Sequence, residues 1–468
     1  MDDALGAGPV RLGTAAGRWV LATTILASGL AFLDATTVNV ALPAIDRDLD
    51  AGFAGLQWTV DAYLLALSAL LLLGGALGDR FGRKRVFVVG LWWFTIASRA
   101  CGLAPTASAL VAARALQGLG AALLVPGSLA IVSAAFGPAQ RGRAIGTWTG
   151  LSGVSTAAGP LLGGLLVDTA TWRWIFLLNV PGALLALWAA RHVPETRDPQ
   201  RARLDVAGSL LAVAALGGIV YALIEGPARG WGQPLVAGLG LAGLAALGAL
   251  VVVERRVAQP MLPPTLFRSR SFVAANVVTL LVYAALTGAT FLVAVHLQAT
   301  LGWSALSAGA ALVPITVMLV LLSPRMGELV GRVGPRWLLT VGSLTAGGGL
   351  ALLTRIEADV GYLGGVFPGV LTFGVGLATV VAPLTTTVLT AAPDTLAGTA
   401  SGVNNAVART AGLLAVALLP LAGGISGDGL EGLAEGFGRA MLAAAGLCAA
   451  AAVVAWCAIR DPERSSRS

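Results

Sequence analysis

The sequence has little charge, almost no lysine and few cysteines, and each shortage excludes a class of protein. Charged residues make up 11% of the 468 residues and hydrophobic ones 57%, whereas about a quarter of the residues of a soluble domain are charged. Of the 30 basic residues all but Lys84 are arginine. Because Lys84 lies between Arg83 and Arg85, no Gly-Lys-Ser/Thr segment exists, and we expect no ATP site.

The cysteines and the other reactive side chains show no pattern of a metal site or an enzyme. Cys101, Cys448 and Cys457 lie in or beside apolar runs without CxxC spacing, so we expect neither a disulfide framework nor a bound metal. No nucleophile with a matching base and no nucleotide motif emerges, which predicts a protein that is not an enzyme and needs no cofactor. The net charge of +7 arises in short loops, which membrane topology explains without a nucleic-acid partner.

Long apolar runs fill most of the chain. About twenty residues cross the hydrocarbon core of a bilayer as a helix, and fourteen runs of this kind occur in groups of six, two and six. They lie near residues 19–42, 56–77, 86–104, 108–132, 143–167, 174–191, 206–224, 235–253, 272–298, 306–328, 337–354, 361–388, 398–423 and 437–459. The sequence predicts an all-α membrane protein with 14 transmembrane helices, arranged as two pseudo-symmetric six-helix bundles plus two inserted helices (6+2+6).

Polar, proline-containing segments at 191–205 and 254–270 separate the three groups. Placing both termini in the cytoplasm puts 22 of the 30 lysines and arginines in cytoplasmic segments, six in external ones and two within spans. Cytoplasmic loops of membrane proteins carry such an excess, so we expect a multi-pass protein of the cell membrane with both termini inside. The predicted parts are an N-terminal bundle at 1–192, a linker with two helices at 193–271, a C-terminal bundle at 272–460 and a cytoplasmic tail at 461–468.

A short, glycine-punctuated and charged segment joins the second and third predicted spans. Its cations are typical of a cytoplasmic loop, and its glycines let helices approach closely. A similar spacing of glycine, leucine and arginine recurs at 327–336, with Gly331 in the place of Asp79. This repeat predicts two related halves with a substrate cavity between them. The residues that we expect to act as a conformational latch are Gly75, Asp79, Arg80, Gly82 and Arg83.

This segment resembles the signature loop of the major facilitator superfamily, Gly-x-Leu-x-Asp-Arg-x-Gly-Arg-Lys, and every fixed position is met between residues 75 and 84. The 6+2+6 plan is similar to the fourteen-helix drug/proton antiporter branch of that superfamily. The resemblance covers nearly the whole chain, and it implies a secondary transporter.

Charged residues within the predicted spans are candidates for proton coupling. An ionised carboxylate in hydrocarbon is expensive, so Asp34 should face the bundle interior, a cavity or a cation, and Arg114 is its obvious partner. The stretches around both residues resemble the first-helix and fourth-helix motifs of the drug antiporters, whose arginine is implicated in proton coupling. We predict that role for Asp34, Arg114 and Asp61. Purely structural roles, and the choice of Asp34 or Asp61 as the main titrating group, stay open.

The fifth predicted span combines small residues with a proline. Gly159 and Gly163 are one helical turn apart, and Pro160 removes a backbone bond and bends the helix. Together with Gly150 and Gly164 they resemble the motif that separates superfamily antiporters from uniporters and symporters. The resemblance implies export, although ordinary helix packing would account for each glycine taken singly.

A cavity for bulky organic compounds should be largely apolar with a few polar groups. Aromatic and polar residues in or near the spans are candidates for its lining, and packing or lipid contact is the alternative for each one. The candidates are Trp58, Tyr63, Trp148, Tyr283, Phe291, His296 and Gln298.

Together these features predict a secondary active transporter that exports amphipathic organic compounds, such as drugs or antibiotics, in exchange for protons by alternating access. Its expected partners are the lipid bilayer, protons and an amphipathic small molecule, with neither ATP nor nucleic acid. An exporter of an endogenous metabolite or lipid would carry the same motifs, so that alternative stays open. A non-transporting membrane sensor is a different class of protein, and the intact Asp34 and Arg114 argue against it.

Overall fold

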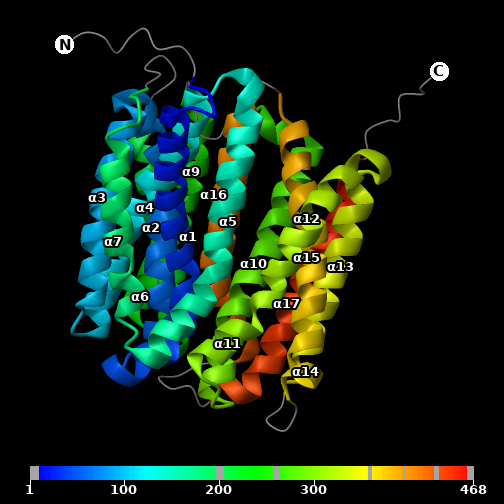
Figure 1. Cartoon of the computed structure of the whole chain (residues 1–468). Coiled ribbons are helices and arrows are strands. Elements are labelled where there is room, and N and C mark those ends of the chain that lie inside the picture. The colour runs from blue at the N-terminus through cyan, green and yellow to red at the C-terminus, as the bar shows by residue number, and fades with distance from the viewer. Residues whose placement is uncertain are drawn as a thin grey trace. The chain divides into compact units, whose positions relative to one another are not determined.

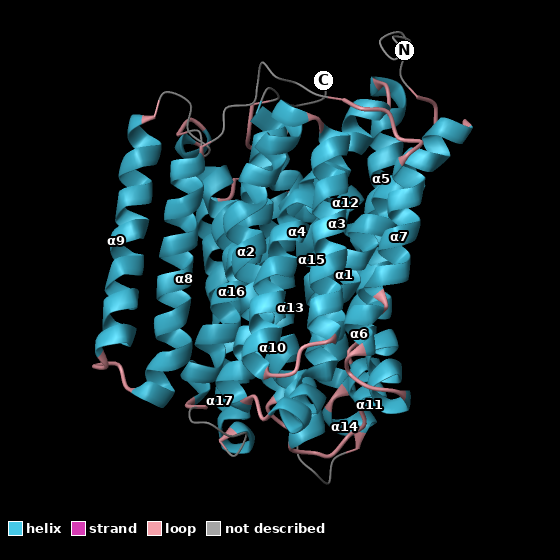
Figure 2. Ribbon diagram, turned by 90° about the vertical axis from the view of Figure 1, so that its left-hand side faces the viewer, coloured by secondary structure: helices cyan, strands magenta, loops and turns pink. Residues whose placement is uncertain are grey.

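The computed structural model describes residues 10–196, 205–257, 264–356, 361–393, 396–425 and 432–460. In this part of the chain the residues form helices joined by short loops, with an isolated bridge between Val10 and Phe136 (Figure 2). Apolar runs in a membrane fold this way because a helix satisfies every backbone polar group within its own segment. The predicted tail at 461–468 and part of the linker lie outside the described residues.

The chain divides into two compact units. Unit 1 runs to Ile219 and also takes in Gly238–Val253 and Ser304–Leu306, and unit 2 holds the rest. In unit 1, α2 and α3 pack against α4, while α5 and α7 pack against α1 (Figure 1). The helices of this unit are α1 (Ala15–Leu49), α2 (Gly52–Phe81), α3 (Arg83–Gly102), α4 (Ala107–Ala135), α5 (Pro138–Thr169), α6 (Trp174–Leu177) and α7 (Asn179–Ala190).

The next two helices, α8 (Val206–Arg229) and α9 (Pro234–Arg256), are divided between the two units. Within unit 1 their backbones approach closely, because a Cβ atom added at Gly218 would lie 2.9 Å from the Cα atom of Gly243. Small residues allow such contacts between membrane helices.

In unit 2, α15 packs against α12 and α13, α17 packs against α13 and α10, and α16 packs against α10. Its elements are η1 (Leu266–Arg268), α10 (Arg270–Ala299), α11 (Ala305–Ala311), α12 (Val313–Val333), α13 (Pro335–Leu353), α14 (Tyr362–Gly365), α15 (Phe367–Thr390), α16 (Ala397–Gly423) and α17 (Leu433–Ala458). The first two residues of α11 cluster with unit 1.

Eleven helices in the described part of the chain are long and apolar enough to cross a membrane, with Ala305–Val333 taken as one. The chain is therefore a multi-pass helical membrane protein. The other three expected runs are helical as α3, α6–α7 and α13, but they are not among these eleven. Helix α3 begins with three cations and carries Arg99 near its end, and the apolar stretch Trp174–Ala190 has fewer than 18 residues.

Helices α1 and α5 lie in close contact because glycines of α5 face side chains of α1. A Cβ atom added at Gly163 would lie 2.9 Å from Cγ2 of Val40, and one added at Gly159 would collide with the hydroxyl of Thr36. Overpacking a filled contact of this kind is destabilising. The small residues of α5 therefore set how near α1 can come.

The proline of α5 adds a polar link to the same contact. Pro160 has no N–H, so the carbonyl of Thr156 loses its helical partner. The hydroxyl of Thr36 on α1 lies 3.3 Å from that carbonyl oxygen, and within its own helix it lies 3.0 Å from the carbonyl oxygen of Leu33 and 3.3 Å from that of Phe32. Further along α5, a Cβ atom added at Gly164 would lie 2.5 Å from the Cα atom of Leu306.

Gly159→Ala tests this packing, with Gly150→Ala as the matched control, because a Cβ atom at Gly150 would meet nothing within 4 Å. We expect Gly159→Ala to lower the free energy of unfolding by about 1–3 kcal/mol through overpacking. Gly150→Ala should leave it unchanged or raise it slightly, since alanine favours helices over glycine. Thermal unfolding of the full chain in detergent measures both, and equal melting temperatures for the two variants would contradict the packing.

Candidate functional site

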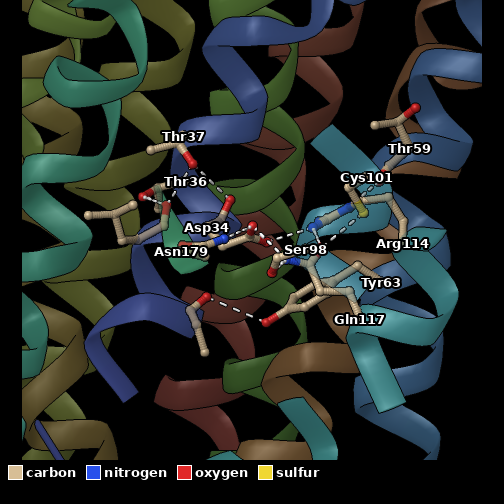
Figure 3. A network of polar contacts seen from close by, with 12 residues as sticks. Asp34, Thr36, Thr37, Thr59, Tyr63, Ser98, Cys101, Arg114, Gln117 and Asn179 are labelled. Atoms are coloured by element: carbon tan, nitrogen blue, oxygen red, sulfur yellow. Dashed lines mark hydrogen bonds and ion pairs between the residues drawn. The ribbon is translucent and has the colours of Figure 1, made fainter. Parts of the chain in front are cut away.

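The centre of the site is the carboxylate of Asp34, on α1, which is fully buried. Nη1 of Arg114, from α4, lies 2.5 Å from its Oδ2 atom. Its Oδ1 atom accepts hydrogen bonds of 2.9 Å from Nε2 of Gln117 and of 2.9 Å from Nδ2 of Asn179 (Figure 3). Residues from α1, α4 and α7 thus converge on one carboxyl group, and the hydrogen bond from the Arg114 guanidinium is charge-assisted, which makes it stronger than a neutral one.

Arg114 is held from several sides and is only 1% exposed. Its Nε donates to the carbonyl oxygen of Thr59 at 2.9 Å, and Nη1 also donates to Oε1 of Gln117 at 2.5 Å. The guanidinium carbon lies 4.4 Å from the ring centre of Tyr63 and 5.6 Å from that of Phe176. Aromatic faces attract cations, and the attraction increases when both groups are desolvated. Helix α2 is thus tied to the same ion pair.

Gln117 connects the ion pair to α3. Its Nε2 donates both to Asp34 and, at 2.8 Å, to the hydroxyl of Ser98. Its Oε1 accepts from Arg114 and lies 3.6 Å from the thiol sulfur of Cys101 (Figure 3). Each end of the amide therefore has a charged partner that matches its polarity, which fixes its orientation.

The structure brings the predicted pair of Asp34 and Arg114 together and adds partners that the sequence analysis did not assign. Gln117 follows Arg114 by three residues on α4, a spacing that places both on one helix face. That spacing inside an apolar span is the sequence feature that could have identified Gln117 as a member of the site. Asn179 is 145 residues from Asp34 along the chain, so only the fold shows that they meet.

Asp61, on α2, is not part of this network. Its side chain is fully buried, and neither carboxylate oxygen is hydrogen-bonded to a described residue. The ring of Tyr63 packs against Arg114, and a residue two positions away along a helix points to a different side. The buried side chains of Gln57 and Ser68 lie on the same face of α2 as Asp61, at helical spacings.

The predicted latch loop is closed by a short ion pair. Nε of Arg83 lies 2.7 Å from Oδ1 of Asp79, and the guanidinium of Arg80 lies 5.5 Å from the ring centre of Phe81. At the start of the loop, a Cβ atom added at Gly75 would be in ordinary contact, at 3.7 Å, with Pro126 of α4. The ion pair thus joins the end of α2 to the start of α3, and the contact at Gly75 joins α2 to α4.

A carboxylate that the sequence analysis did not single out also binds this loop. Glu195, which follows α7, accepts hydrogen bonds from the backbone N–H groups of Lys84 at 2.9 Å and of Arg85 at 3.1 Å. An anion at a helix N-terminus is favoured by the helix dipole. Gly82, with φ of 112°, leaves the space that this carboxylate fills, because an added Cβ would lie 2.9 Å from Cδ of Glu195.

The residues predicted to line a cavity fall into both units. In unit 1, Trp58 is half-buried, Tyr63 lies under the Arg114 guanidinium and Trp148 is buried. In unit 2, the His296 ring is stacked on Phe437 at 4.0 Å.

The remaining cavity candidates of unit 2 lie on α10. Neither ring nitrogen of His296 has a hydrogen-bond partner among the described residues, and Nε2 of Gln298 donates to the carbonyl oxygen of Ala294 at 3.0 Å. Phe291 is fully buried, whereas Tyr283 is partly exposed. Among the residues that the structure describes, no group of three or more His, Cys, Asp or Glu is placed to hold a metal ion.

Comparison with known proteins identifies the family. Residues 24–416 match the model of the Major Facilitator Superfamily. The chain belongs to this superfamily. Its members are transporters, which is not a class of enzyme.

Several relatives of the chain are resistance proteins. The puromycin resistance protein of Streptomyces alboniger is 38% identical over 94% of this chain and 90% of its own length. The methylenomycin A resistance protein of Streptomyces coelicolor is 36% identical over 95% of this chain and 93% of its own length. The multidrug resistance protein Stp of Mycobacterium tuberculosis is 40% identical over 82% of this chain and 72% of its own length.

Solved structures agree on the fold. A peptide transporter of the POT type, in complex with sulfate, superposes with a TM-score of 0.71 at 16% identity, covering 96% of both chains. A bacterial homologue of the human lysosomal transporter Spinster superposes with a TM-score of 0.68 at 18% identity, covering 95% of this chain and 97% of that one. At these identities the likeness concerns the fold alone.

The buried ion pair predicts a strong energetic coupling between its two partners. Removing one partner leaves the other charge buried and uncompensated, which costs about 3–5 kcal/mol. We therefore expect Asp34→Asn and Arg114→Gln each to lower the free energy of unfolding strongly. The decrease in the double variant should be clearly smaller than the sum of the two single decreases. Denaturant unfolding of the full chain in detergent gives all three values, and strictly additive losses would rule out the coupling.

Proposed function

We propose that this chain exports amphipathic organic compounds, antibiotics among them, in exchange for protons by alternating access. The observation that carries the proposal is the sealed pair of Asp34 and Arg114, which joins α1 to α4 inside unit 1. Relatives named for resistance to puromycin, for resistance to several drugs and for export of tetracenomycin C support this class of substrate.

Asp34 is the group that takes up and releases the proton in this proposal. Its ionised form is matched by donors from Arg114, Gln117 and Asn179. When Asp34 is protonated its charge disappears, but arginine keeps its own at any relevant pH. The bundle then holds an uncompensated buried cation, which costs several kcal/mol. Protonation therefore favours a different arrangement of α1, α4 and α7.

Asp61 provides a second intramembrane carboxyl group. It is fully buried on α2 and is bonded to no described donor, and an ionisable residue at such a depth is a functional candidate by default. We assign it to proton coupling beside Asp34 and Arg114. Since it lies outside the Asp34 network, its proton can be exchanged without breaking that ion pair.

The proton gradient supplies enough free energy for this exchange. A membrane potential of about 100 mV contributes roughly 2.3 kcal/mol per charge, and one pH unit adds about 1.4 kcal/mol. For a neutral substrate the sum supports an export ratio of roughly several hundred per proton.

The proposal includes the full architecture predicted from the sequence. Fourteen spans in a 6+2+6 order cross the cell membrane with both termini in the cytoplasm. The N-terminal bundle is 1–192, the linker with two helices is 193–271, the C-terminal bundle is 272–460 and the cytoplasmic tail is 461–468. The substrate cavity is lined by Trp58, Tyr63, Trp148, Tyr283, Phe291, His296 and Gln298.

Two other groups of residues control the conformational change in this proposal. The loop residues Gly75, Asp79, Arg80, Gly82 and Arg83 act as a latch, which the ion pair of Asp79 with Arg83 supports. The antiporter helix uses Gly150, Gly159, Pro160, Gly163 and Gly164, and its close packing on α1 supports a link to the proton site.

Transport by the full chain in proteoliposomes tests the function. Ethidium, a lipophilic cation, and chloramphenicol, a neutral antibiotic, are followed under an imposed proton gradient, with and without a protonophore. We expect gradient-driven transport by the wild type and at least a tenfold loss in Asp34→Asn. Asp50→Asn is the matched control, because Asp50 is exposed and its φ of 49° suits asparagine.

The other outcomes separate the alternatives. Full transport by Asp34→Asn would contradict the role of Asp34, and a loss in Asp61→Asn alone would move proton coupling to α2. No transport of either probe by the wild type would contradict broad export and favour a single endogenous substrate.

A further inference from the structure

A carboxylate near the outer end of α1, as the proposed topology places it, ties this helix to the segment that precedes α6. Nε1 of Trp172 donates to Oδ2 of Asp48 at 2.9 Å, and Nη1 of Arg173 forms an ion pair with the same oxygen atom. Nη2 of Arg173 also donates, at 3.2 Å, to the carbonyl oxygen of Ala104 between α3 and α4. We call Asp48, Trp172 and Arg173 the outer clamp.

The outer clamp fixes positions more than it adds stability. The side chains of Asp48 and Arg173 are 46% and 32% exposed, and an ion pair in contact with water contributes little to the free energy of folding. Trp172 is buried, so its indole N–H needs an acceptor within the protein. The guanidinium carbon of Arg173 lies 4.4 Å from the ring centre of Trp172. One carboxylate therefore sets the position of two large side chains.

The segment that follows the outer clamp reaches the Asp34 network. The ring of Trp172 meets the ring of Phe176 edge-on, with 6.1 Å between the ring centres. Phe176 is fully buried, and its ring centre lies 5.6 Å from the guanidinium carbon of Arg114. Three residues further on, Asn179 donates to Oδ1 of Asp34 (Figure 3). Residues 172–179 therefore contact the clamp at one end and the buried ion pair at the other.

This segment is one helical stretch. Arg173 and Leu178, which flank α6, have φ values of −60° and −57° with helical ψ, so the backbone continues from α6 into α7 without an extended residue. Asp48 lies about 21 Å from Asp34 along the axis of α1, at the standard rise per residue, and so does not touch the network. Two paths connect them, which are α1 itself and residues 172–179.

We propose that Asp48 is a positioning residue for the proton site. By holding Trp172 and Arg173, it places residues 172–179 so that Asn179 donates to Asp34. Release of the outer clamp withdraws this donor, and a carboxylate that loses a hydrogen-bond donor is less stable in its ionised form. The outer surface of unit 1 thereby acts on the group that carries the proton. The inference deepens the proposed function and rests on it only in taking Asp34 as the proton carrier.

Deuterium exchange at the side-chain amide of Asn179 tests this placement without requiring transport. Heavy-nitrogen labelling of asparagine in the purified full chain gives NMR spectra with few side-chain signals, and Asn179→Ala identifies the one from Asn179. The chain holds five asparagines, which are Asn39, Asn179, Asn276, Asn404 and Asn405. We expect the Asn179 amide to exchange about tenfold faster in Asp48→Ala than in the wild type, the factor that one hydrogen bond to a charged group contributes.

Signals from other asparagines in the same sample are internal controls. The amides of Asn276 and Asn404 are hydrogen-bonded within unit 2, so a general loosening of the protein would speed their exchange as well. Asn39 lies on α1 between the two carboxylates, so its signal reports a distortion of α1. We expect the three signals to be unchanged in Asp48→Ala.

Asp50→Gly is the matched control variant. It removes the same charge from the same end of α1, Asp50 is exposed, and its φ of 49° suits glycine. Asn179 should exchange as slowly in this variant as in the wild type. Where Asp48→Ala gives no folded, monodisperse protein, Arg173→Gln takes its place with the same expected result.

The proposal is overturned if Asn179 exchanges equally fast in the wild type and in Asp48→Ala. That result would mean that packing alone holds the segment, for example at Gly102, where an added Cβ atom would lie 2.7 Å from Cγ of Leu177. Equal acceleration of the unit 2 amides, or an equal change of the Asn39 signal, would also overturn it.

Failure of this inference and failure of the proposed function are distinguishable. Slow exchange of Asn179 in Asp48→Ala, together with loss of transport in Asp34→Asn, would remove the inference alone. Fast exchange in Asp48→Ala, together with full transport by Asp34→Asn, would contradict the role of Asp34 in the proposed function and would support the placement of Asn179 by the outer clamp.

Discussion

An ionised carboxylate inside a helical bundle is stable only when opposite charge and hydrogen-bond donors surround it. Asp34 meets this condition through Arg114, Gln117 and Asn179. Because Arg114 also bonds to the backbone of α2, and Gln117 to a hydroxyl on α3, the arrangement of α1, α2, α3, α4 and α7 depends on the charge of one side chain. In the proposed function, protonation of Asp34 therefore changes the balance between conformations of the whole bundle.

Helix α1 connects the Asp34 network to α5. Within two turns of Asp34, Thr36 meets Gly159, and Thr37 and Val40 meet Gly163 of α5. The carboxylate and the tight contact thus sit on one rigid segment, so a shift of α1 that follows protonation moves both. Close packing without voids transmits such shifts rather than absorbing them. In this account the glycines of α5 are needed for export because they define where α1 can rest.

The sequence predicted the parts of the site that follow from local rules. The cost of a buried charge was enough to pair Asp34 with Arg114, and their contact confirms it. Gln117, Asn179 and Glu195 were not assigned, because burying an amide costs less than burying a charge, and a carboxylate at the surface can stay in water. Glu195 meets Lys84 across 111 residues, and no spacing rule covers that distance. The helical class could be predicted because apolar runs leave the backbone few alternatives in a membrane. The number of spans could not be fixed in the same way, because α3 and α13 are less apolar than the other long helices.

The central claim is that the proton and the substrate are exchanged through Asp34. The most direct measurement is the number of protons released when the purified full chain binds tetraphenylphosphonium in weakly buffered detergent, followed with a pH indicator at several starting pH values. We expect the wild type to release protons on binding, and Asp34→Asn to bind the same cation and release fewer protons. Equal release by both proteins would contradict it.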